Sequence, residues 1–150
     1  MGMRKIKSIL LALALCSVAH AQETAVIDVT DKAALEAAKD TSVTVQGKVL
    51  KAEWSRSGKV CNVTFEGAPH FMAAAFEKGR EKLDAAFNGD FAANITGATI
   101  KLSGKLAAYG GRDPAMKEAT QMIIGTTNQI TVVTPATPAT PATAPSTQPQ

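Results

Sequence analysis

Residues 42–65 read SVTVQGKVLKAEWSRSGKVCNVTF, and this stretch decides the fold. From Val43 to Val49, valine or glycine alternates with polar residues, and a second alternation runs from Cys61 to Phe65 after a turn at Ser57-Gly58. A period of two is typical of half-buried strands, so the stretch predicts a long, bent β-hairpin. Gly47 offers no side chain to a core, which predicts a bulge or bend of the kind that coils a strand round a small barrel.

Three more strands are predicted downstream, at 71–76 (FMAAAF), 97–109 (GATIKLSGKLAAY) and 120–125 (TQMIIG), and residues 129–133 close the domain. Between 78 and 88 the apolar residues Leu83, Ala86 and Phe87 follow helical spacing instead, so one helix is expected between the third and fourth strands. Residues 43–49 and 100–106 share the pattern apolar, polar, apolar, polar, Gly, Lys, apolar. Two strands with the same bend are expected to lie side by side in a closed barrel.

The two ends of the chain differ in composition from the middle. Residues 1–21 combine a basic start, an apolar run at 9–18 and a small-residue cleavage site at Ala19-His20-Ala21, which predicts a secretory signal peptide and no membrane span. Residues 22–41 form a lead-in with a short extended piece and a helix over 32–39, capped by Thr30 or Asp31. Residues 134–150 repeat Thr, Pro and Ala and predict a disordered tail.

Charge and cysteine content limit the functions to be considered. Removing residues 1–21 removes three of the 16 basic residues and none of the 13 acidic ones, so the formal net charge falls from +3 to zero. The whole-chain charge is therefore no argument for nucleic-acid binding. Cys61 is the only cysteine that remains, so no internal disulfide is expected, and its place on the apolar side of a strand predicts a buried thiol.

The order strand, strand, strand, helix, strand, strand over residues 42–133 resembles an OB-fold, a mostly β, five-stranded barrel. The segments VTVQGKV (43–49), IKLSGKLAAYGGR (100–112) and NQITVV (128–133) resemble the small bacterial OB-fold domains related to those of tRNA-binding proteins and exported nucleases. The resemblance implies a ligand on strands two and three, between the first-to-second and fourth-to-fifth loops.

Aromatic and basic residues near these two loops are the candidate ligand-binding residues, since single-strand binders stack bases on rings and neutralise phosphates with Lys or Arg. They are Trp54, Arg56 and Lys59 at the first loop, and Tyr109, Arg112 and Lys117 at the other. The alternative is that Trp54 covers a barrel end with Tyr109 packed beside it, while the basic residues only solvate the loops.

No residue pattern predicts catalysis, a metal or a cofactor. His70 is the only histidine after residue 21, and with Cys61 it lacks a third, orienting member. Two functions remain: an exported, non-catalytic module that binds single-stranded nucleic acid or another anionic polymer, and an envelope protein-interaction domain with no nucleic-acid role. In both cases the protein is expected in the bacterial periplasm or outside the cell.

Overall fold

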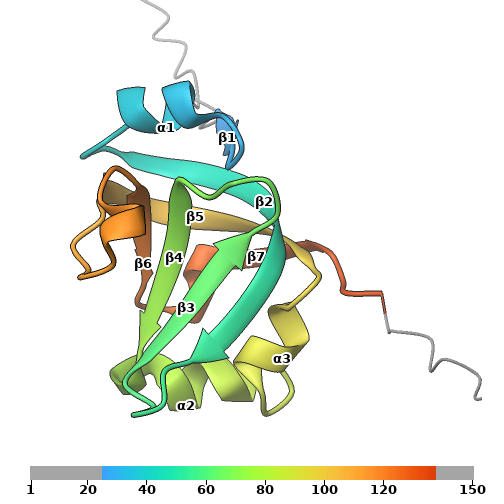
Figure 1. The fold of residues 1–150 in the computed structure, drawn as a ribbon. Coiled ribbons are helices and arrows are strands. Elements are labelled where there is room, and N and C mark those ends of the chain that lie inside the picture. The colour runs from blue at the N-terminus through green and yellow to red at the C-terminus, as the bar shows by residue number, and fades with distance from the viewer. Residues whose placement is uncertain (1–24, 138–150) are drawn as a thin grey trace, which may run out of the picture.

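A computed structural model describes residues 25–137, in which five strands close into a barrel (Figure 1). They are β2 (Ser42–Trp54), β3 (Val60–Phe65), β4 (Phe71–Phe76), β5 (Thr99–Ala108) and β6 (Thr120–Ile124). The pairing order is β2-β3-β4-β6-β5 and back to β2, with β4 and β6 parallel and the other neighbours antiparallel. This arrangement is that of an OB-fold, so the predicted fold class is confirmed.

Strand β2 takes part in both halves of the barrel. Its first half, Ser42–Lys48, pairs with β5, and its second half pairs with β3 from Val49 onward. The two strands with the shared sequence pattern therefore lie side by side, as predicted. Their alternating residues point inward, so Val45 and Leu102, which face each other in the register, are both buried.

The bend in β2 does not lie at Gly47, where the sequence predicted it. The register shifts between Val49 and Lys51, and the intervening Leu50 is 61% exposed. Gly47 has a different role, because the side chain of Val29 occupies the place where a Cβ would project. Val29 is buried and its N–H donates to the Gln46 carbonyl at 2.9 Å, so the glycine lets the lead-in pack directly on the barrel.

The lead-in forms β1 (Val26–Asp28), parallel to β2, and α1 (Lys32–Ala37), which covers one end of the barrel (Figure 1). Asp31 caps α1 by accepting a hydrogen bond from the Ala34 N–H at 3.0 Å. Leu35 of this helix is fully buried in the core. The predicted short helix before the barrel is thus confirmed.

The connection between β4 and β5 contains two helices, which corrects the prediction of one. Helix α2 (Glu77–Ala86) ends before Asn88 and Gly89, whose positive φ angles of 55° and 92° are incompatible with a continuing helix. Asp90 then caps α3 (Phe91–Ile95) by accepting from the Ala93 N–H at 3.0 Å. The second helix forms because Phe91 and Ile95 bury their side chains in the barrel core.

Two short 3-10 turns and one more strand complete the described residues. They are η1 (Pro114–Met116) between β5 and β6, η2 (Thr127–Gln129), and β7 (Ile130–Thr134), which pairs with β5. Across residues 25–137, no helix is long and apolar enough to span a membrane. The predicted signal peptide (1–21) and nearly all of the predicted tail (134–150) lie outside the described residues.

The glycine in β2 gives a stability test. Gly47→Ala is expected to lower the free energy of unfolding by about 2 to 3 kcal/mol, because the new methyl group overlaps Val29 in a packed core. Gly79→Ala in α2 is the matched control: a Cβ there meets only ordinary contacts, and alanine favours a helix by roughly 0.5 to 1 kcal/mol. Urea unfolding of both variants checks the prediction, and equal effects would contradict it.

Candidate nucleic-acid interface

The structure places the predicted residues Trp54, Arg56 and Lys59 around the turn between β2 and β3, beside α2 (Figure 1). Arg56 and Lys59 are exposed, and Trp54 is half-buried. Trp54 and Arg56 line a shallow pocket of about 320 Å³ together with Lys51, Glu53, Ser55, Asn62 and Thr64. This part of the predicted site therefore lies at the barrel end that carries α2 and α3.

The ring of Trp54 is already engaged by the protein. It packs against the hydrophobic core, and the Arg80 guanidinium lies 4.7 Å from the ring centroid, within cation–π distance. Its indole N–H is buried and has no hydrogen-bond partner. Trp54 therefore lies where the alternative interpretation placed it, over one end of the barrel. The Arg80 guanidinium occupies ring surface that a stacked base would need.

The connection between β5 and β6 contains the other predicted residues, Tyr109, Arg112 and Lys117. The end of this connection lies beside His70. Arg112 and Lys117 are exposed, while the ring of Tyr109 folds back over Gly111. This connection lies at the end of β3 and β4 that is opposite to the β2–β3 turn. Each of these two strands has six residues and spans roughly 17 Å. The structure does not bring the two predicted groups together, and Tyr109 is not packed beside Trp54.

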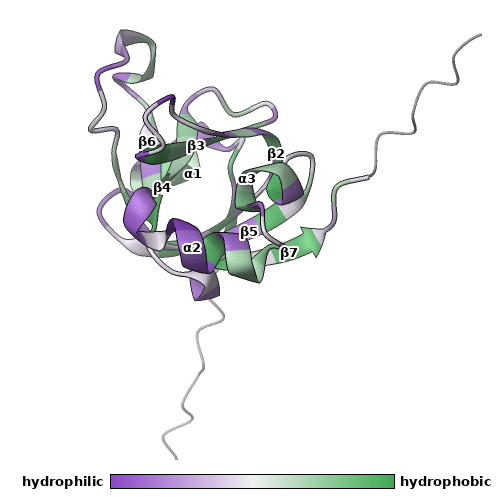
Figure 2. Ribbon diagram, turned by 90° about the horizontal axis from the view of Figure 1, so that it is seen from below, coloured by the Kyte–Doolittle hydropathy of each residue, from purple (hydrophilic) through white to green (hydrophobic). Residues whose placement is uncertain are grey.

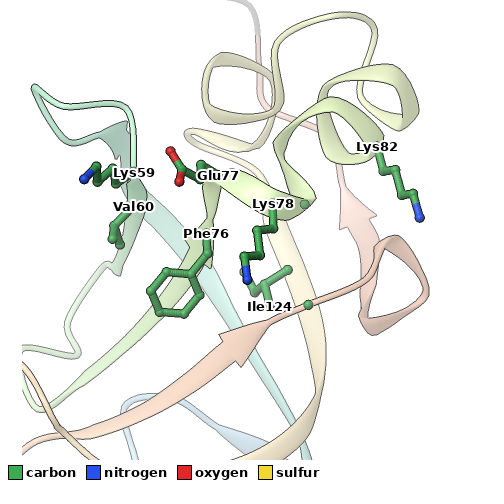
Figure 3. A pocket seen from close by; sticks show the side chains of 9 residues that line it. Lys59, Val60, Phe76, Glu77, Lys78, Lys82 and Ile124 are labelled. Atoms are coloured by element: carbon green, nitrogen blue, oxygen red, sulfur yellow. The ribbon is translucent and has the colours of Figure 1, made fainter.

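A larger pocket, of about 650 Å³, lies on the outer face where β4 enters α2 (Figure 3). Phe71, Ala73 and Ala75 of β4 point into the core, so the alternation turns Phe76 outward, and its side chain is 45% exposed. Val60 of β3 faces Phe76 in the register. The pocket volume is typical of ligand sites, and Phe76 gives it an aromatic surface.

Four charged residues surround this aromatic surface. Lys59, Glu77, Lys78 and Lys82 line the pocket, and none of them forms an ion pair within residues 25–137. Lys59 is brought there because its carbonyl accepts a hydrogen bond from the Glu77 N–H at 2.9 Å. Lys78 and Lys82 stand one helical turn apart on α2, a spacing at which like charges repel slightly. Three lysines against one glutamate make the pocket net positive.

Two glycines, Gly79 and Gly125, line the pocket beside Phe76. In the parallel pairing of β4 and β6, Ala75 faces Ile124, so Gly125 follows beside Phe76 without a side chain. The backbone of Gly125 is held by Gln129, whose Oε1 accepts its N–H at 2.7 Å, while Nε2 of Gln129 donates to the Ser103 and Ile123 carbonyls at 3.1 Å. Gly79 lies close to the Gly125 carbonyl on the helix side.

Of the six predicted residues, Lys59 is the one that lines this pocket, and the sequence reasoning missed Phe76, Lys78 and Lys82. A usable signal was present. Phe71 and Phe76 are five residues apart, so strand alternation places them on opposite faces of the sheet. Since Phe71 belongs to the core, Phe76 had to face outward, next to a helix that carries Lys78 and Lys82 in its first two turns.

The cysteine and the histidine lie apart. Cys61 is fully buried opposite Ala75, and burial raises the pKa of its thiol to about 11. His70 precedes β4 at the other end, in a pocket of about 220 Å³ with Lys32 and Glu118. A protonated, buried thiol is a poor nucleophile. Within residues 25–137, no group of three His, Cys, Asp or Glu side chains is placed to hold a metal ion.

Comparison with known proteins supports the fold. A protein assigned as an aspartyl-tRNA synthetase from Leishmania major Friedlin superposes with a TM-score of 0.53 at 14% identity, over 84% of this chain. The aspartyl-tRNA synthetase from Entamoeba histolytica does so with a TM-score of 0.50 at 11% identity, also over 84%. This chain spans 24% of each of these proteins. No family model and no curated protein matches the sequence.

The unpartnered indole N–H of Trp54 leads to a stability prediction. Trp54→Phe removes a buried donor that has no acceptor and keeps an aromatic ring under Arg80, so it is expected to change the free energy of unfolding by less than about 1 kcal/mol. Trp54→Ala removes the ring and is expected to cost roughly 2 to 3 kcal/mol. Urea unfolding followed by circular dichroism measures both, and a Phe variant as unstable as the Ala variant contradicts the reasoning.

Proposed function

We propose that this protein is an exported, non-catalytic OB-fold module that binds single-stranded nucleic acid in the pocket at the end of β4. The observation that carries the proposal is the exposed ring of Phe76 on the outer face of the barrel, beside three lysines that have no ion-pair partner among residues 25–137. An aromatic ring for a base and cations for phosphates are the two parts that single-strand binders combine.

The location of the pocket agrees with the fold. Phe76 lies on the face formed by β3 and β4, the second and third strands of the barrel, on which OB-folds bind oligonucleotides. The two structural neighbours are described as tRNA synthetases, so the same fold occurs in proteins named for an RNA substrate. Export is supported by the signal-like composition of residues 1–21 alone.

The stacking part is tested with Phe76→Ala. Fluorescence anisotropy of a labelled oligonucleotide at low salt is expected to show an affinity about five- to a hundredfold lower than that of the parent, since one stacked base contributes roughly 1 to 3 kcal/mol. Leu50→Ala is the matched control, because Leu50 is exposed but does not line the pocket. Failure of the parent protein to bind any single strand at low salt would overturn the proposal.

The electrostatic part is tested in the same assay by varying salt. Each phosphate contact contributes about 0.7 to the slope of log affinity against log salt for single strands. Changing Lys59, Lys78 and Lys82 together to Gln is therefore expected to reduce the slope by about 2. Lys105→Gln, on the exposed face of β5 away from the pocket, is expected to leave the slope nearly unchanged.

The protein-interaction alternative rests on a different feature, the edge strand β7. This strand pairs with β5 alone in the described part of the chain, and Val132 and Val133 are 40% and 47% exposed. Figure 2 shows β7 in the hydrophobic colour at the rim of the barrel. It carries neither a charge nor a proline, the residues that usually protect sheet edges, so an extended segment of a partner could pair with it.

An edge that accepts a partner strand also accepts a second copy of the same chain. On this alternative, sedimentation velocity at increasing protein concentration is expected to show a dimer that Val132→Lys lacks. Thr131→Lys, a change of the same charge one residue away, reports whether the position matters. A parent protein that stays monomeric up to millimolar concentration argues against use of this edge.

A further inference from the structure

The pocket contains one acid whose presence the charge argument does not explain. Glu77 is the first residue of α2 and directly follows Phe76, and its side chain is exposed in a pocket whose other charged lining residues are lysines (Figure 3). For a site that only attracts phosphates, a carboxylate is a disadvantage. We infer that Glu77 makes the pocket selective for guanine among the bases that stack on Phe76. The inference rests on the proposed function.

Guanine differs from the other bases in the hydrogen bonds that it can donate to a carboxylate. An ionised carboxylate is an acceptor only, with two oxygens that can receive two parallel hydrogen bonds. Guanine has two adjacent donors, N1–H and N2–H, on its Watson–Crick edge. Adenine and cytosine place a single amino donor next to an acceptor nitrogen, and thymine or uracil places one donor between two carbonyl oxygens. In single strands this edge is free to be read, so the carboxylate pairs fully with guanine and faces a lone pair of every other base.

The geometry holds the carboxylate in a defined place relative to the ring. Phe76 is the last residue of β4, with φ −104° and ψ 157°, and Glu77 starts the helix with its N–H bonded to the Lys59 carbonyl at 2.9 Å. A strand on one side and a helix on the other fix the junction. Figure 3 shows the Glu77 carboxylate turned towards Lys59, while the Phe76 ring and the Lys78 amino group extend the other way, near Ile124. In the inferred complex the base lies on the Phe76 ring with its reading edge directed to the Glu77 side of the pocket, and its phosphate lies near Lys78.

A structural role for Glu77 must be separated from this one. An acid in the first turn of a helix is stabilised by the free N–H groups there, so removing it weakens the helix whatever the ligand. Glu81 offers the matched comparison, because it is an exposed acid on the same helix and does not line the pocket. The two Glu→Gln variants change the net charge equally and differ in their access to the base.

The experiment measures the affinity of the purified full chain for oligothymidines of eleven bases whose central base is G, A, C or T, by anisotropy at low salt. The parent is expected to bind the guanine strand at least about fivefold more tightly than the other three. Glu77→Gln is expected to lose this preference and Glu81→Gln to keep it. A strand with central inosine, which retains N1–H but lacks the N2 amino group, is expected to lose most of the preference in the parent protein itself.

The possible outcomes separate the inference from the proposed function. If the parent binds all four strands equally, or if both Glu→Gln variants change the preference alike, the guanine selectivity is overturned while binding at Phe76 stands. If no strand binds, the proposed function is overturned and the selectivity with it. The inosine measurement needs no variant, so a Glu77→Gln protein that folds poorly leaves the test intact.

Discussion

Closure of the barrel depends on one strand that pairs with two different partners along its length. The 13 residues of β2 form hydrogen bonds with β5 in the first half and with β3 in the second, and the register shift between Val49 and Lys51 marks the change. Every buried backbone group of the sheet needs a partner, so a straight β2 would leave either β3 or β5 unpaired. The bend therefore decides whether the five strands can close, and the helices at each end cover what closure leaves open.

The candidate site is a consequence of that closure. Once β5 returns to β2, β6 fills the remaining gap between β5 and β4 and runs parallel to β4. This pairing brings Gly125 beside Phe76, and Gln129 holds the backbone there with both ends of its side chain. The pocket thus joins the β2–β3 turn, the start of α2 and the end of β6.

Local sequence patterns predicted the strands and the capped lead-in helix, because alternation and capping act over a few residues. Val45, Cys61 and Leu102 are buried where the period of two places them. The patterns were less informative about contacts between distant segments. Gly47 was interpreted as a bend, whereas it accommodates Val29, and the second helix α3 depends on burying Phe91 and Ile95 in a core that the sequence alone does not display.

The amino-acid sequence by itself determined the fold class, since its hydrophobic periods and turns allow little else than a small, mostly β barrel with a helix before the fourth strand. It also identified aromatic and basic residues near two loops. Only the tertiary structure decided which of them share a site: Trp54 is covered by Arg80, Tyr109 lies at the opposite end, and Lys59 joins Phe76, Lys78 and Lys82. The reason is physical: strand pairing joins segments about fifty to sixty residues apart, and these pairings set the distances between the site residues. No local pattern encodes their register.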